Sequence, residues 1–124
     1  MGSEEFIAKA RRFTRSAELL LEDGDYGSVA SRCYYAMFLA SEAMLNAKGV
    51  RTHTHKGMMS LFWSHFVKNG EVAEVHLKAL RSVYDLRQRG DYATGVPVDR
   101  TDAEVALDKA RGFLTMSEAW FGRT

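Results

Sequence analysis

The segment CYYAMFLASEAML, residues 33–45, constrains the fold most strongly, because it would be apolar on nearly every side of a helix. A helix with one apolar stripe lies at a protein surface, whereas a helix that is apolar all round is buried among others. The helical pattern around this segment begins at about Asp25 or Ser28 and ends at Lys48, before Gly49. We therefore expect a buried helix at the centre of the fold. Its few polar interruptions are Arg32, Ser41, Glu42 and Asn46.

Four further segments carry apolar residues at the three- and four-residue spacing of amphipathic helices. The predicted helices run from about Ser3 to Asp23, from about His55 to Lys68, from near Glu71 to a break at Gly90, and from Thr101 onward. Residues 90–100, which include the single proline, form the longest predicted loop. The sequence thus predicts an all-α fold, an antiparallel bundle of four to five helices, with residues 1–124 as a single domain.

Polar residues and glycines beside these segments predict where the helices begin and end. Ser3 is expected to cap the first helix by accepting a hydrogen bond from a free backbone N–H, and Gly24 to end it. Thr101 and Glu104 have the spacing of a capping box at the start of the last helix.

The charge balance limits what the surface can bind. The chain has 17 lysines and arginines against 16 aspartates and glutamates, a formal net charge of +1. This excludes the broad basic surface that duplex nucleic acid requires, although it permits a local basic cleft. No apolar run approaches the ~18 residues of a membrane span, and the first residues lack the apolar core of a signal peptide. We therefore expect a cytoplasmic protein with no membrane partner. The lone cysteine, Cys33, cannot form an internal disulfide and is expected to be a small buried apolar group.

The stretch DLRQRGDY, residues 85–92, ends the fourth predicted helix with a cluster of charges. Because each residue turns a helix by ~100°, Arg87 continues the inward face that Leu80 and Val83 define. Arg89 falls on the opposite side and is expected to be a solvated charge. An inward arginine needs a partner, since an unpaired buried charge is very costly.

Asp91 and Glu42 are the candidate partners of Arg87, and two interpretations are open. In the structural one, Arg87 and Asp91 form a clamp that fixes the long loop. In the functional one, the Arg87 guanidinium is exposed in a groove and binds phosphate, for which its planar fork of N–H donors is suited.

Two further groups of side chains are candidates for a site. Arg32 and Tyr35 are neighbours on one face of the central helix. Tyr35 is either a core tyrosine with a satisfied hydroxyl, or it lines the same cleft as Arg87 together with Arg32. His53, His55 and His65 lack a nearby cysteine or carboxylate that would complete a ligand set, so we assign no metal and no cofactor.

Four segments, taken in order, carry a family resemblance. They are ASRCYYAMFLASEAML at residues 30–45, HKG at 55–57, FVKNGEV at 66–72 and LRQRGDY at 86–92. Together they resemble the HEPN family of small helical-bundle proteins, and are most similar to its short single-domain members. The resemblance implies a bundle that forms a homodimer with a polar cleft near the interface. It also implies a partner, because many members are paired with a minimal nucleotidyltransferase in toxin–antitoxin systems.

The resemblance implies roles for particular residues as well. Many members are ribonucleases that act through an arginine followed four to six residues later by a histidine. Arg87 matches the arginine, but the histidine has no match, because His76 is the last histidine of the chain. Histidine is the usual general base near neutral pH, and arginine cannot easily replace it. The candidate catalytic residues are therefore Arg87, Asp91 and Tyr92, and the candidate nucleotide- or RNA-binding residues are Arg32, Tyr35 and Arg87.

Three hypotheses follow. The chain binds RNA, a nucleotide or a nucleotidyltransferase partner through a cleft around Arg87. Alternatively, it is a metal-independent ribonuclease whose motif lacks the histidine. In the third hypothesis it is a structural interaction module in which Arg87 is locked to Asp91 or Glu42.

Overall fold

The computed structural model describes residues 2–52, 54–92 and 96–123, and for Tyr92 it describes the backbone alone. Within these residues the chain is all-α, as predicted, and contains no strand. The elements are α1 (Ser3–Asp23), α2 (Tyr26–Ala47), α3 (His55–Phe62), the π-helical segment η1 (Trp63–Val67), α4 (Glu74–Tyr92) and α5 (Arg100–Gly122).

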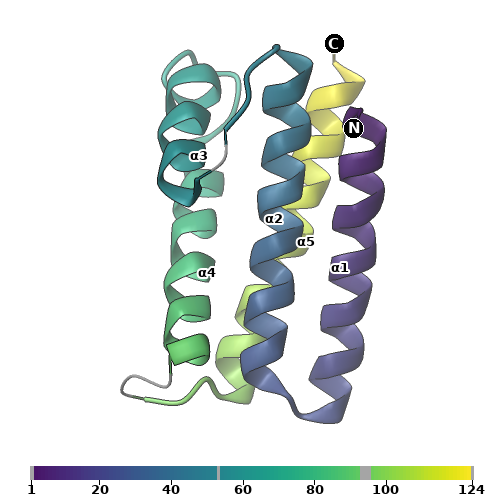
Figure 1. Cartoon of the computed structure of the whole chain (residues 1–124), viewed down its shortest axis with the longest axis vertical. Coiled ribbons are helices and arrows are strands. Elements are labelled where there is room, and N and C mark those ends of the chain that lie inside the picture. Colours follow the sequence, from purple (N-terminus) through teal and green to yellow (C-terminus); the bar gives the residue numbers. More distant parts are fainter. Residues whose placement is uncertain (1, 53, 93–95, 124) are drawn as a thin grey trace.

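Helix α2 lies at the centre of the bundle and contacts α1, α3, α4 and α5. Figure 1 shows α1 on one side of α2 and α3 and α4 on the other, with α5 passing behind α2. The four long helices α1, α2, α4 and α5 alternate in direction along the chain, and both termini lie at the same end. The antiparallel bundle predicted from the sequence is therefore confirmed.

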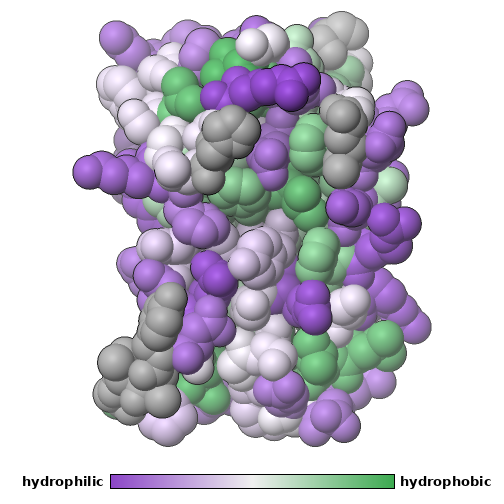
Figure 2. Space-filling view, viewed as in Figure 1, coloured by the Kyte–Doolittle hydropathy of each residue, from purple (hydrophilic) through white to green (hydrophobic). Residues whose placement is uncertain are grey.

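The composition of α2 explains its central place. Eleven of its 22 residues are buried, and they form a broad face of the helix. Small residues let its neighbours approach closely, since alanines of α1, α2 and α5 are almost fully buried where these helices meet. Figure 2 shows hydrophilic residues along both edges of the face in front of α2, with paler residues down its lower middle. The buried alanines include Ala10, Ala17, Ala36, Ala40, Ala43, Ala106 and Ala110.

The start of α1 differs from the prediction. Gly2 occupies the N-cap position, and no side chain caps the helix. Ser3 lies inside the helix, where its hydroxyl donates a 3.1 Å hydrogen bond to the backbone oxygen of Ala43. Ser3 therefore ties α1 to α2 instead of capping α1. The predicted end is confirmed, because Gly24 has a left-handed φ of 83° that favours glycine.

Both ends of α4 also differ from the prediction. The helix begins at Glu74 and not near Glu71, because Gly70 has a φ of 79° and ends a turn at residues 68–70, which a bend at residues 71–72 follows. At its other end α4 continues through Gly90 to Tyr92. Gly90 fits there because its backbone lies against α2: an added Cβ would meet the Cα of Gly27 at 3.4 Å. The predicted break at Gly90 is therefore wrong, since glycine serves here for close packing.

The cap of α5 is formed by a different pair from the one predicted. The Asp99 side chain accepts a 2.8 Å hydrogen bond from the N–H of Asp102, and the Asp102 side chain accepts one from the N–H of Asp99. The proposed box of Thr101 and Glu104 is wrong, because Thr101 lies inside the helix. Aspartate and threonine are both good N-caps, so spacing alone did not separate the two boxes.

Cys33 is buried, as predicted, and burial raises the pKa of its thiol to about 12, so the thiol is protonated at neutral pH. None of the helices in the described part of the chain is long and apolar enough to cross a membrane.

Replacing Asp99 by alanine is expected to lower the free energy of unfolding by about 1 kcal/mol, because the first turn of α5 loses its side-chain acceptor. The matched control is Thr101→Ala, which removes an exposed side chain two residues away. Urea denaturation of both variants measures the difference. Equal destabilisation by the two substitutions would contradict the assignment of Asp99 as the cap.

Candidate functional site

Arg87 faces inward from α4, as its position on the helix predicts, and its side chain is only 16% exposed. Its Nη2 donates a 3.0 Å hydrogen bond to the hydroxyl of Tyr35, and its Nε lies 3.2 Å from Oδ2 of Asp91. The guanidinium carbon lies 4.9 Å and 5.4 Å from the ring centres of Tyr35 and Tyr34. Aromatic faces attract a cation, so the charge is compensated by a carboxylate, a hydroxyl and two rings.

One buried N–H group of Arg87, at Nε, is left without a hydrogen bond by these contacts. Its Nε is buried and makes no hydrogen bond within the described residues, although Asp91 Oδ2 is close enough for an ion pair. Of the two predicted partners, Asp91 forms this ion pair, one helical turn away on the same helix. Because α4 continues through Gly90, Arg87 and Asp91 are four residues apart on one helix face.

Arg89 is not the solvated charge that the sequence predicts. Its Nη2 lies 2.5 Å from Oδ2 of Asp102, and its side chain is 34% exposed, with a buried Nε. Asp102 belongs to the capping box of α5, so this ion pair joins α4 to the start of α5. A helical wheel of α4 alone does not contain this information, because the partner comes from another helix.

An open groove of about 660 Å³ runs between the end of α1, the start of α2 and the end of α4. Arg32, Tyr35 and Asp91 all line it, so the structure brings together these three candidate residues. Arg87 lies behind Tyr35 and Asp91, which it contacts, and is absent from the wall itself. The remaining lining residues are Leu20, Asp25, Gly27, Ser28, Ser31 and Gly90.

Arg32 is the accessible cation of this groove. It is exposed, and its guanidinium carbon lies 5.3 Å from the ring centre of Phe13. Among the described residues no carboxylate pairs with it, whereas Asp91 pairs with Arg87. The side chain of Tyr92, the third catalytic candidate, lies outside the described part of the chain.

The structure adds a residue that the sequence interpretation did not place in the site. This residue is His55, the first residue of α3. Its Nδ1 and the hydroxyl of Tyr34 are joined by a 2.5 Å hydrogen bond. Its ring also packs against Tyr34, Phe38 and Tyr84, with centres 5.3–5.4 Å away. The sequence did indicate that Tyr34 has a polar partner, because a tyrosine in a helix that is apolar all round needs a partner for its hydroxyl.

Arg87 and burial set the ionisation states of this pair. Burial raises the pKa of Tyr34, and the nearby Arg87 partly opposes that effect. Burial lowers the pKa of His55, and the positive charge of Arg87 lowers it further. At neutral pH the phenol is therefore protonated and the imidazole is neutral.

A sequence model of the HEPN domain matches residues 3–120 of the chain. The chain belongs to the HEPN domain family. In the sequence of this HEPN domain, no histidine follows Arg87.

Named relatives agree with this assignment. A UPF0332 protein of Thermotoga maritima is 34% identical over 110 residues, which cover 89% of this chain and 83% of that protein. A protein of Methanocaldococcus jannaschii named "Putative toxin" is 28% identical, over 94% of this chain and 80% of its own. The crystal structure of TT1696 from Thermus thermophilus superposes with a TM-score of 0.81 and covers 95% of this chain and 97% of that one. Its identity is 22%, so it supports the HEPN fold alone.

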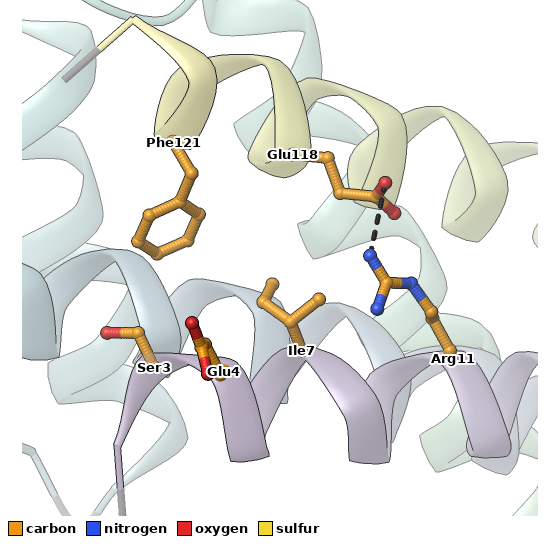
Figure 3. A pocket seen from close by; sticks show the side chains of 6 residues that line it. All are labelled: Ser3, Glu4, Ile7, Arg11, Glu118 and Phe121. Atoms are coloured by element: carbon orange, nitrogen blue, oxygen red, sulfur yellow. Dashed lines mark ion pairs between the residues drawn. The ribbon is translucent and has the colours of Figure 1, made fainter.

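Another hollow of the HEPN domain, about 600 Å³, lies between the start of α1 and the end of α5. Figure 3 shows Phe121 reaching from α5 toward the start of α1, near Ser3 and Glu4, while the ion pair between Arg11 and Glu118, 3.3 Å apart, spans the two helices. Its arginine is already paired, and none of the predicted site residues lines it. In the described part of the chain, no group of three or more histidine, cysteine, aspartate or glutamate residues could hold a metal ion, and His53 lies outside that part.

Replacing Arg87 by glutamine is expected to raise the pKa of His55, because a nearby positive charge that disfavours the imidazolium is removed. An NMR titration of the histidine ring signals measures the effect. Arg87→Lys, which keeps the charge, should leave the pKa low. The internal control is His76, whose pKa is lowered by burial alone. An unchanged pKa of His55 in Arg87→Gln, or an equal rise for His76, would contradict the coupling.

Proposed function

We propose that this HEPN protein binds single-stranded RNA through the groove between α1, α2 and α4, as the RNA-directed component of a toxin–antitoxin type system. The observation that carries the proposal is Arg32, an exposed guanidinium in a groove, with no carboxylate partner among the described residues. A guanidinium in this setting is suited to a phosphate oxygen, because its N–H donors are available and its charge is permanent.

The other groups of the groove suit RNA better than a bare anion. Ser28 and Ser31 offer hydroxyls near Arg32, and the half-buried ring of Tyr35 offers a surface for a base. Asp25 and Asp91 offer carboxylate oxygens, which repel phosphate but accept hydrogen bonds from a ribose 2′-hydroxyl or a base amino group. A mixed groove of this kind is compatible with the low net charge of the chain.

Arg87 acts behind the groove in this proposal. Its contacts to Tyr35 and Asp91 hold the hydroxyl and the carboxylate in the wall, so Arg87 positions the groups that meet RNA. The proposal therefore combines the structural interpretation, an ion pair between Arg87 and Asp91, with the functional one, a groove that binds phosphate. Cleavage is not part of the proposal, because no histidine follows Arg87 and Nδ1 of His55 is engaged by Tyr34.

The relatives support the biological setting. Two proteins of Methanocaldococcus jannaschii that are named "Putative toxin" are 28% and 30% identical to the chain. We carry that role over to this chain as part of the proposal, together with a minimal nucleotidyltransferase as its partner protein.

Replacing Arg32 by alanine is expected to weaken RNA binding about tenfold, because one charge-assisted phosphate contact is lost. Fluorescence anisotropy with a labelled single-stranded RNA of about twelve nucleotides measures the affinity. The slope of log affinity against log salt should shrink by about 0.7, the value for one phosphate contact on a single strand.

The matched control is Arg12→Ala, which removes the same charge from an exposed position of α1. Equal losses in the two variants would contradict the groove as the binding site. The RNA is recovered after binding in EDTA and checked for length. Metal-independent cleavage that disappears in Arg87→Ala would favour the ribonuclease hypothesis instead.

We also propose that the chain forms a homodimer, because several large apolar residues are exposed on the described surface: Leu19, Trp63, Val75, Val96 and Val105. Light scattering should give twice the monomer mass of 14.0 kDa. Adding a minimal nucleotidyltransferase, the proposed partner, should increase that mass further. A mass of one chain at working concentration would contradict the dimer.

A further inference from the structure

A second cavity, of about 310 Å³, lies between α3 and α4 and is separate from the groove. Its lining residues include His55, Met59 and Tyr84. The ring centres of His55 and Tyr84 are 5.4 Å apart, and the rings are inclined at 41°. Aromatic faces and a polarisable thioether beside a small cavity are suited to a flat, polarisable group.

Two cations without ion pairs stand beside this cavity. On α4, the described cations Lys78, Arg87 and Arg89 each pair with a carboxylate, but Arg81 does not. Within the described part of the chain Arg81 has no ion-pair partner, even though Asp85 follows it by one helical turn and lines the same cavity. Lys56 of α3, also exposed, has no carboxylate partner within the described residues. The cavity therefore has positive charges available on both of its helices.

The side chain of His55, a lining residue of this cavity, has one fixed hydrogen-bond donor. The hydroxyl of Tyr34 is fully buried, and His55 is its hydrogen-bond partner, so the buried O–H donates to Nδ1. A neutral imidazole whose Nδ1 accepts a hydrogen bond carries its proton on Nε2. The ring lining the cavity thus offers an N–H at Nε2, which suits a carbonyl or ring nitrogen of a base.

We propose that this cavity binds one nucleoside of a single-stranded RNA, with its base against His55, Met59 and Tyr84. Lys56 and Arg81 bind the flanking phosphates, and Nε2 of His55 donates a hydrogen bond to the base. The proposal rests on the proposed function and extends it from one groove to two contact sites. Every base has a π face, so such a site accepts different sequences, whereas a paired base in a duplex cannot enter it.

One cluster of side chains joins the cavity to the groove. Arg87 lies over the rings of both Tyr34 and Tyr35. Tyr35 lines the groove, while Tyr34 is bonded to His55 of the cavity. A strand that occupies both sites would therefore contact groups positioned by the same buried charge.

The experiment compares two double variants that each remove two exposed cations. Lys56→Ala/Arg81→Ala removes the pair beside the cavity, and Lys9→Ala/Arg12→Ala removes two cations of α1 that form no ion pair among the described residues. For a labelled single strand of about twelve nucleotides, the first is expected to weaken binding about tenfold or more. Its salt slope should shrink by about 1.4, or 0.7 for each of two phosphate contacts. The α1 double variant should change both quantities by less than half as much.

Base stacking is measured separately with RNA that carries 2-aminopurine, whose fluorescence falls when it stacks on an aromatic ring. Binding should quench this fluorescence, and Tyr84→Leu, which keeps an apolar side chain, should reduce the quenching. Circular dichroism melts confirm that each variant is folded.

The outcomes separate this inference from the proposed function. If Arg32→Ala weakens binding and the two double variants behave alike, the cavity is not a binding site, and the groove proposal stands. If Lys56→Ala/Arg81→Ala weakens binding and Arg32→Ala does not, the cavity is supported, and the groove proposal fails. If the unaltered protein binds no RNA, both are overturned.

Discussion

The guanidinium of Arg87 is the charge on which the surrounding arrangement depends. A buried cation is costly unless carboxylates, hydrogen bonds or aromatic faces compensate it, and here Asp91, Tyr35 and the ring of Tyr34 do so together. Asp91 can reach Arg87 because α4 remains helical beyond Gly90. Burial lowers the pKa of His55 and the same charge lowers it further, so that imidazole is neutral next to Tyr34. One buried charge thus influences both the groove and the cavity between α3 and α4.

This arrangement changes how the HEPN motif is interpreted in this chain. The resemblance to the HEPN family implies a site made of an arginine and a later histidine, but no histidine follows Arg87 in this chain. The structure does bring a histidine near Arg87, but from α3 and through Tyr34, with its Nδ1 already engaged. A neutral imidazole held in this way is a hydrogen-bond donor at Nε2, not a general base. This chemistry favours binding over cleavage, and it motivates the two contact sites proposed for RNA.

Several features could be predicted because they depend on neighbours within one helix. The position of Arg87 relative to Leu80 and Val83 was enough to predict that its side chain faces inward, since all three share a helix face. The features that were missed involve partners distant in sequence. Arg89 pairs with Asp102 of the next helix, and Tyr34 pairs with His55, 21 residues away. The choice of Asp99 over Thr101 as the cap also depends on where α5 begins relative to α4, which a spacing rule does not include.

The sequence by itself determined the helical class, the central place of α2 and the inward direction of Arg87, because apolar periodicity decides which faces must leave water. Only the tertiary structure decided how that charge is compensated, that Gly90 packs against Gly27 inside a continuing helix, and that Arg32, Tyr35 and Asp91 share one groove. The physical reason is that a polar group can be satisfied by any partner of suitable chemistry. Which partner it meets depends on the packing of whole helices, and that packing is fixed by contacts between residues far apart in the chain.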